Sequence, residues 1–152
     1  MEYILDMTWQ VKECEAYTSW FETHSSELQD EILAKVGVLR REGPGLGRPV
    51  VDTLEGSEYS NMKELRVQYQ GEPWRILFAF DPEREAILLL GGNKTGNDQW
   101  YEENIPIADK RYAEHLDALR QKREEEKKHD HIRRKNGSSV PRKKGKNRGK
   151  NR

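Results

Sequence analysis

Apolar residues near the start of the chain follow two different periods. Between about Met7 and Lys12, Trp9 and Val11 alternate with polar residues, which predicts a short, half-buried strand. From Cys14 to His24 the apolar residues recur at helical spacing instead, as on one face of an amphipathic helix. The chain is therefore predicted to begin with a strand that leads into a helix.

A second helical stripe begins after Ser26. Gln29 stands three positions later, and this pair fits a capping box at the start of a helix. The helix should end before the Gly-Pro-Gly run at 43–45, because glycine and proline do not prolong a helix. The apolar positions of the stripe are Leu28, Ile32, Leu33, Val36 and Leu39. The two helices together form a predicted hairpin.

Three strand-like runs follow, at Met62–Tyr69, Trp74–Asp81 and Ala86–Leu90. Only short, turn-like breaks separate them, which predicts an antiparallel meander. The first run alternates apolar and polar residues, whereas the middle run is apolar almost throughout. We therefore expect the middle strand to lie at the centre of the sheet.

A last helix is predicted after these strands. Asn97 or Asp98 can cap it. We expect its final segment to begin at Pro106, because proline is favoured in a first helical turn. The apolar side of that segment consists of Tyr112, Leu116 and Leu119. Helices and strands that are segregated along the chain in this way predict an α+β fold.

The net charge of zero hides a strong asymmetry. Residues 1–119 carry 12 Lys or Arg against 23 Asp or Glu, whereas residues 120–152 carry 15 against 4. Such a split is typical of a globular body with an interaction tail. We expect one domain at 1–119 and a charged extension at 120–152, helical through about Lys128 and disordered from Asn136 onward.

The composition, 34% hydrophobic and 36% charged, is that of a soluble protein. No apolar run approaches the roughly 20 residues that a membrane-spanning helix needs. Met1–Asp6 lacks the cationic start and the apolar core of a signal peptide. The single cysteine, Cys14, allows no internal disulfide. We therefore expect a cytoplasmic protein with no membrane partner.

The sequence predicts neither a metal site nor a cofactor. Its histidines and one cysteine lack close ligand spacing, and the one tight group, His129-Asp130-His131, lies in a charged segment. The run at 91–96 joins glycines to Lys-Thr, but Leu88 and Asn93 stand where a phosphate loop requires glycine. No G-x-S-x-G motif occurs, which removes the commonest hydrolase template.

What remains is a set of cations and a phenol that the predicted strands can bring to one face. Its members are Lys63, Arg66, Arg75, Lys94 and Tyr101. Arg75 interrupts an otherwise apolar strand, where an unpaired guanidinium would be costly. Glu64 is its partner in a purely structural interpretation, and spacing alone does not decide between that interpretation and a functional one.

Five blocks of sequence stand in order along the chain. They are PGLGRPVVDTLEGS at 44–57, NMKELR at 61–66, PWRILFAFD at 73–81, LGGNKTG at 90–96 and WYE at 100–102. In this order they resemble the phage-derived, HigB-like branch of the RelE/ParE superfamily of toxins, over about residues 9–119. The resemblance implies a RelE-like fold, in which an N-terminal strand and a helical hairpin pack on an antiparallel sheet that is followed by a C-terminal helix.

The resemblance also implies an endoribonuclease that cuts messenger RNA on translating ribosomes. The substrate's 2′-hydroxyl would attack the adjacent phosphate without any cofactor. Arg66 and Arg75 would stabilise the phosphorane. Lys94 would neutralise the phosphate or protonate the leaving oxygen, while Tyr101 would stack on a nucleotide or transfer a proton. Glu64 is a candidate base, or else it holds the two arginines in place.

The body is acidic where RNA-cleaving toxins of this superfamily are often basic, so phosphate affinity has to come from local clusters or from the tail. The candidate RNA contacts are Lys63, Arg142, Lys143, Lys144 and Lys146. Family membership implies a cognate helix-turn-helix antitoxin as partner. Two other functions stay open, a ParE-like inhibitor of DNA gyrase and a nontoxic protein that binds nucleic acid through its tail.

Overall fold

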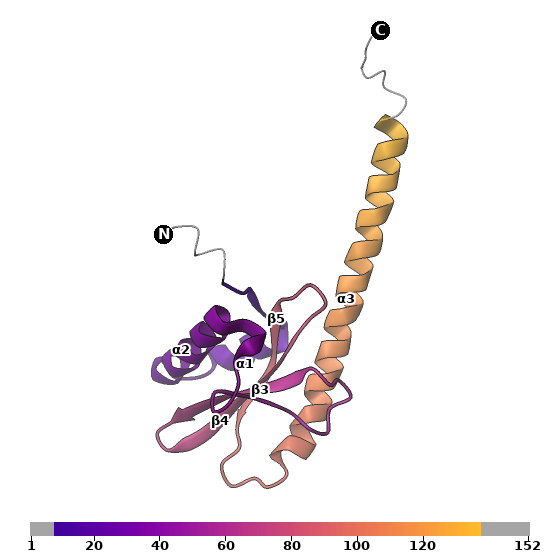
Figure 1. Ribbon diagram of the computed structural model, residues 1–152. Helices are drawn as coiled ribbons and strands as arrows, with labels where there is room; N and C mark the ends of the chain where they lie inside the picture. The colour runs from indigo at the N-terminus through magenta and orange to yellow at the C-terminus, as the bar shows by residue number, and fades with distance from the viewer. Residues whose placement is uncertain (1–7, 138–152) are drawn as a thin grey trace, which may run out of the picture. The chain divides into compact units, whose positions relative to one another are not determined.

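The computed structural model describes residues 8–137 and has an α+β architecture (Figure 1). Its elements, in order, are β1 (Val11–Glu13), α1 (Glu15–Glu22), α2 (Ser26–Glu42), a 3-10 turn (Gly43–Gly45), β2 (Val51–Thr53), β3 (Met62–Tyr69), β4 (Glu72–Phe80), β5 (Ala86–Asn93) and α3 (Trp100–Gly137). Two compact units meet between His115 and Leu116, inside α3. Within the described residues, no helix has the length and apolarity needed to cross a membrane.

The five strands form one sheet in the order β1-β5-β4-β3-β2. β3, β4 and β5 make the predicted antiparallel meander, and β4 occupies the predicted central position. β3 has the predicted bounds, and two differences lie at the edges of the sheet. β1 is shorter than predicted and pairs parallel to β5, with Val11 opposite Ala86. β2, which was not predicted, pairs antiparallel to β3.

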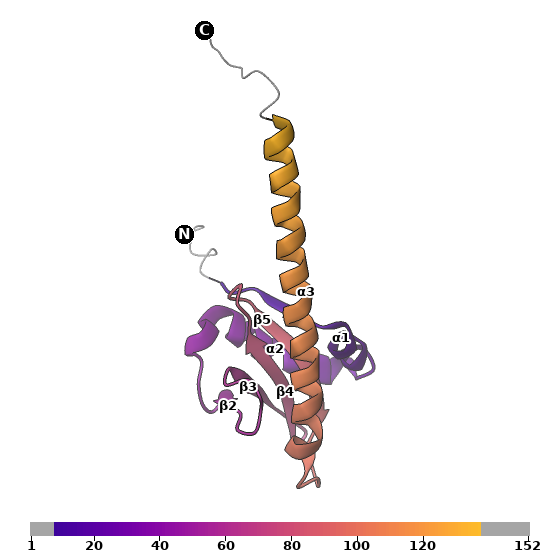
Figure 2. The same cartoon turned by 90° about the vertical axis from the view of Figure 1, so that its right-hand side faces the viewer.

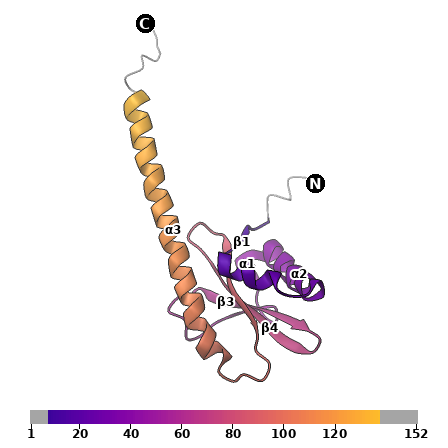
Figure 3. The same cartoon turned by 180° about the vertical axis from the view of Figure 1, so that it is seen from behind.

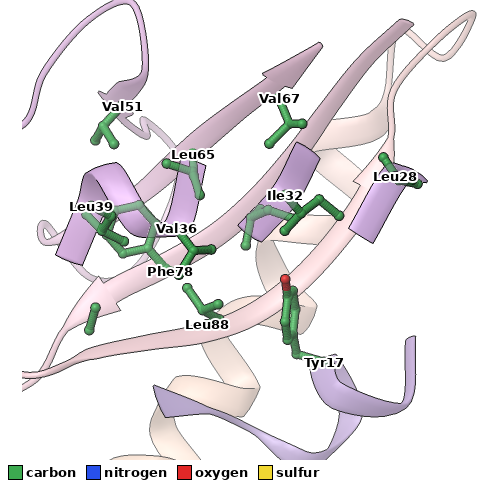
Figure 4. Close-up of a cluster of buried hydrophobic side chains, with 12 residues drawn as sticks. Tyr17, Leu28, Ile32, Val36, Leu39, Val51, Leu65, Val67, Phe78 and Leu88 are labelled. Carbon is green, nitrogen blue, oxygen red and sulfur yellow. The ribbon is translucent and has the colours of Figure 1, made fainter. Parts of the chain in front are cut away.

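α1 and α2 cover one face of the sheet, and Figure 4 shows the apolar side chains that meet there. Along α2 the buried positions are spaced four, four and three residues apart, which is one face of a helix. They are Leu28, Ile32, Val36 and Leu39. Leu33, which we expected in this stripe, is 51% exposed because it falls beside the face that the sheet covers.

The first four turns of α3, residues 100–115, cover the opposite face of the sheet, as Figures 2 and 3 show from two sides. The alternation of a strand explains how β5 serves both layers, because successive residues point to opposite faces. The Cα of Gly91 lies against the indole of Trp20 in α1, and the Cα of Gly92 lies against Trp100 in α3. Trp100 is 5% exposed, as expected for a core residue.

Two features of the helices differ from the sequence prediction. The N-cap of α2 is Ser25 and not Ser26, and its hydroxyl accepts a hydrogen bond from the Leu28 amide. Gln29 therefore makes no capping box, and its side-chain amide donates to the carbonyl of Phe21 and to that of His24. These two bonds close the turn between α1 and α2.

α3 is also longer than predicted. Pro106 lies inside it and does not start a new segment, because the second turn is already helical at that position. Proline removes one amide donor from the helix. The helix then continues to Gly137, so our expectation of disorder from Asn136 is wrong for the first two residues of the tail, and the rest of that stretch lies outside the described residues.

Gly91→Ala should destabilise the protein strongly. A Cβ at this position would collide with the Trp20 indole, so the sheet and α1 would have to separate. Overpacking of this kind costs about 2 kcal/mol. Gly47→Ala is the matched control, because nothing lies within 4 Å of a Cβ there. Urea unfolding should show a lower midpoint for the first variant only, and equal midpoints would contradict the packing described here.

Candidate functional site

The candidate site is centred on one buried carboxylate. Glu64 lies in β3 and is only 3% exposed. Its Oε1 accepts a hydrogen bond from the Tyr101 hydroxyl at 2.6 Å and forms an ion pair with Nε of Arg75 at 3.3 Å. The same Nε donates a hydrogen bond to the Tyr101 hydroxyl, also at 3.3 Å. Its Oε2 accepts from Nε of Arg66 at 3.2 Å. Three donors, one each from β3, β4 and α3, thus meet on this carboxylate.

The sheet register brings these residues together. Arg66 follows Glu64 by two positions in β3, so both side chains leave the same face of the sheet. Arg75 in β4 stands directly opposite Arg66. Tyr101 lies in the first turn of α3, which covers this face. The structure therefore brings together four of the five catalytic candidates predicted from the sequence, which are Glu64, Arg66, Arg75 and Tyr101.

Two arginines that face each other across a strand pair repel each other unless a counter-charge intervenes. Glu64 supplies one counter-charge, and Asp52 in β2 supplies another through its Oδ2, 3.1 Å from a terminal nitrogen of Arg66. Burial favours a higher pKa for Asp52, but hydrogen bonds from Arg48 and from the Thr53 amide, with the charges of Arg48 and Arg66, hold its pKa below the usual range. Asp52 is therefore charged at neutral pH.

Tyr101 keeps its proton in this site. Burial is the main cause that raises the pKa of its phenol, and the hydrogen bond to Glu64 raises it further, while the hydrogen bond from Arg75 opposes the shift. The fifth candidate, Lys94, follows β5, and its Nζ lies 5.6 Å from the centre of the Tyr101 ring. The site therefore presents a phenol donor beside an ammonium group.

The residues predicted to bind RNA do not lie in the Glu64 site as the structure describes it. Lys63 immediately precedes Glu64 in β3 and so points to the other face, where its Nζ donates to the Thr53 hydroxyl at 3.3 Å. The idea that Lys63 converges with the other cations is wrong. Arg142, Lys143, Lys144 and Lys146 lie outside the described residues. Their part in RNA binding, like that of Lys63, stays a prediction.

Sequence reasoning missed Asp52, the second partner of Arg66. Its strand, β2, is only three residues long, too short to show a period. The signal that was available is the charge of Asp52 inside the sequence block at 44–57, next to a loop that leads into β3.

Metal ligands are sparse in this part of the molecule. Among residues 8–137, no group of three or more His, Cys, Asp or Glu side chains could hold a metal ion. His115 lies 2.8 Å from the buried Asp81 through its Nε2. Asp81 in turn accepts hydrogen bonds from the amides of Glu83 and Glu85, so this pair closes the β4–β5 turn. The chemistry available at the Glu64 site is that of cations, a phenol and a carboxylate.

Residues 19–113 match the family described as phage derived protein Gp49-like. The match spans every strand but β1 and includes all of the Glu64 site. The chain belongs to this family. Its predicted HigB-like character is confirmed by two relatives from Mycobacterium tuberculosis that are named as candidate toxins, HigB2 and HigB3.

This Gp49-like chain is 50% identical to HigB2 over 104 residues, which are 67% of this chain and 52% of HigB2. It is 53% identical to HigB3 over 93 residues, which are 60% of this chain and 80% of HigB3. The chain thus spans about half the length of the first relative and four fifths of the second.

Solved structures were also compared with this Gp49-like chain. A mutant of the Escherichia coli toxin RelE in the free state aligns with a TM-score of 0.46 and 12% identity, over 63% of this chain and 94% of RelE. The archaeal RelE–RelB complex from Pyrococcus horikoshii aligns with a TM-score of 0.44 and 15% identity, over 59% of this chain and 99% of that chain.

Glu64→Gln should lower the pKa of Tyr101 while leaving it above the ordinary 10.0, because burial, the main cause of the shift, persists when the carboxylate charge is removed. A phenol whose pKa is raised by folding stabilises the protein fully below pH 10, and that contribution is lost as pH rises through the folded pKa. In the variant, this contribution of Tyr101 to stability should therefore be lost at a lower pH than in the parent.

The measurement is a titration of ¹³C-labelled tyrosine side chains by NMR. Tyr112 is the internal control, because its pKa is raised mainly by burial and its hydroxyl contacts Asn61 and not Glu64. An unchanged or higher pKa for Tyr101 in Glu64→Gln, with Tyr112 unmoved, would show that the phenol does not donate to this carboxylate.

Proposed function

We propose that this chain is the toxin of a type II toxin–antitoxin system and that it cuts messenger RNA on translating ribosomes. The attack would come from the substrate's own 2′-hydroxyl, and no metal ion would take part. The observation that carries the proposal is the convergence of Arg66, Arg75 and Tyr101 on Glu64. The names of HigB2 and HigB3 as candidate toxins support the broader part of it.

In this proposal the two arginines stabilise the phosphorane. A guanidinium presents donors in a planar fork that matches two phosphate oxygens. Nε of Arg66 and Nε of Arg75 are engaged by Glu64, so each guanidinium is already oriented before substrate arrives. Oriented donors need little reorganisation in the transition state, and one such donor is worth about 10²- to 10³-fold in rate.

Proton transfer is assigned to Tyr101, and charge neutralisation to Lys94. Tyr101 keeps its proton, and its hydroxyl would turn from Glu64 toward the leaving 5′-oxygen to donate it. Lys94 beside the ring would neutralise the phosphate. Glu64 is a poor base here, because its oxygens already accept hydrogen bonds from Arg66 and Tyr101 and form an ion pair with Arg75. We therefore assign it a positioning role, and the proton of the attacking 2′-hydroxyl leaves to solvent water.

The proposal extends to partners and to the tail. A cognate helix-turn-helix antitoxin would cover the Glu64 site in the inactive complex. Residues 1–119 would carry the catalytic activity, and the basic residues of 120–152 would supply affinity for RNA that weakens with salt. A ribosome supplies both the messenger strand and a large anionic surface.

Arg75→Ala should abolish growth arrest on induced expression and lower cleavage of ribosome-bound messenger RNA by about 10²- to 10³-fold, because it removes one phosphate donor. Arg41→Ala is the matched control, an exposed arginine in the last turn of α2, and should act as the parent does. Circular dichroism should show both variants folded.

Three results would contradict the proposal. A folded Arg75→Ala variant that cuts and arrests growth like the parent would remove Arg75 from the mechanism. Inhibition of DNA gyrase by the parent, with intact messenger RNA, would favour the ParE-like alternative. A chain that lacks residues 138–152 should still cut, whereas loss of every effect in that variant would favour binding through the tail alone.

A further inference from the structure

The proposed catalytic arginines open onto a cavity that the mechanism above does not use. It has a volume of about 530 Å³. Arg66 and Arg75 line it together with Glu31 and Lys35 of α2 and Gln68 of β3. Pockets of roughly 300–1,000 Å³ take small ligands, so the space suits a single nucleotide.

The α2 residues of this cavity have no polar side-chain partner in the part of the chain that the structure describes. Glu31 and Lys35 are one helical turn apart, so their side chains leave α2 in the same direction. Neither side chain, nor that of Gln68, has an ion pair or a side-chain hydrogen bond within residues 8–137. Arg66 and Arg75, by contrast, are held by carboxylates. Lys35 is therefore the cation of this cavity that a ligand reaches without displacing a protein carboxylate.

The lining residues differ in what they can bind. Lys35 is a mobile point charge, which suits a phosphate oxygen but carries no information about the base. Glu31 accepts hydrogen bonds only, so it favours a base edge that donates. An exposed cytosine presents an amino group at its N4 position, where uracil presents a carbonyl oxygen that repels a carboxylate. The apolar atoms of Pro49 and Val50 in the lining offer contact for a ring.

We propose that this cavity binds one nucleotide of the RNA next to the cleaved phosphate, with Lys35 holding a backbone phosphate and Glu31 selecting a base that carries an exocyclic amino group. Gln68, which both donates and accepts, completes the contact to the base edge. This inference rests on the proposed function, because the neighbouring phosphate would lie between Arg66 and Arg75. It adds a specificity determinant on α2, outside the Glu64 network.

The two α2 residues predict separable effects. Glu31→Gln replaces an acceptor by a group that also donates, so discrimination between cytosine and uracil should fall from roughly fivefold to near unity, the size of one hydrogen bond. Lys35→Gln should weaken binding of every sequence alike and flatten the slope of log affinity against log salt by about 0.7, the share of one phosphate of single-stranded RNA. A purely structural role for either residue would produce neither pattern.

The experiment uses the full chain and an RNA pool with randomised positions around the cut site, read by sequencing of the products on ribosomes. Asp30→Asn is the control for Glu31→Gln, because Asp30 is an exposed neighbour on α2 that does not line the cavity. Loss of base preference in Glu31→Gln, with a base profile like the parent's in Asp30→Asn, is the expected result. An unchanged base profile would overturn the assignment of Glu31.

A second measurement separates this inference from the proposed function. Binding of CMP and of UMP to the full chain is followed through the backbone amide NMR signals of α2 and β3, which need no cleavage. CMP should shift the signals around Lys35 and Gln68 more than UMP does, and Lys35→Gln should weaken both. Binding without any RNA cleavage would contradict the proposed function alone. Cleavage with no nucleotide response at this cavity would overturn the inference alone.

Discussion

A buried carboxylate that accepts from three elements constrains this protein more than any other polar contact described here. Glu64 links β3 to β4 through Arg75 and links the sheet to the first turn of α3 through Tyr101. A carboxylate that is 3% exposed would be costly without such partners. Breaking a buried pair by removing one partner leaves the other charge uncompensated, so the residues around Glu64 depend on one another.

The same network reconciles an acidic body with a proposed phosphate site. Residues 1–119 carry a net charge of −11, which would repel RNA at long range. At short range, Arg48, Arg66 and Arg75 gather around two carboxylates, Asp52 and Glu64. The local excess is positive, and Lys35 and Lys94 stand close by. Local clustering would thus supply the proposed phosphate site, which the overall charge does not reveal.

Much of the fold could be predicted from the sequence because its elements have strong periods. β3 alternates apolar and polar residues from Glu64 to Tyr69, and its predicted bounds are those of the structure. The same alternation places Lys63 on the face of the sheet opposite to that of Glu64. Its wrong assignment to the cation cluster came from grouping residues by charge alone. The shift of the α2 cap from Ser26 to Ser25 reflects two adjacent serines of equal capping ability.

Other features leave no readable trace in a single sequence. β2 is too short to show a period, and with it Asp52 was missed. Pro106 signals a helix start, yet the helix runs through it, and Ile105 and Ala108 on either side of the proline are buried. In the sequence, Glu31 and Lys35 have the pattern of a solvated helix face. Only the tertiary fold brings these two α2 residues into the same cavity as Arg66.

In the proposed reaction, the substrate's own 2′-hydroxyl attacks the adjacent phosphate. The most direct test is the cleavage of a ribosome-bound messenger that carries a single 2′-deoxynucleotide at the preferred cut position. We predict that the bond after the 2′-deoxynucleotide is not cut, whereas the unmodified messenger yields a 2′,3′-cyclic or 3′-phosphate end. Cleavage of the deoxy-substituted bond to a product with a 3′-hydroxyl end would contradict it.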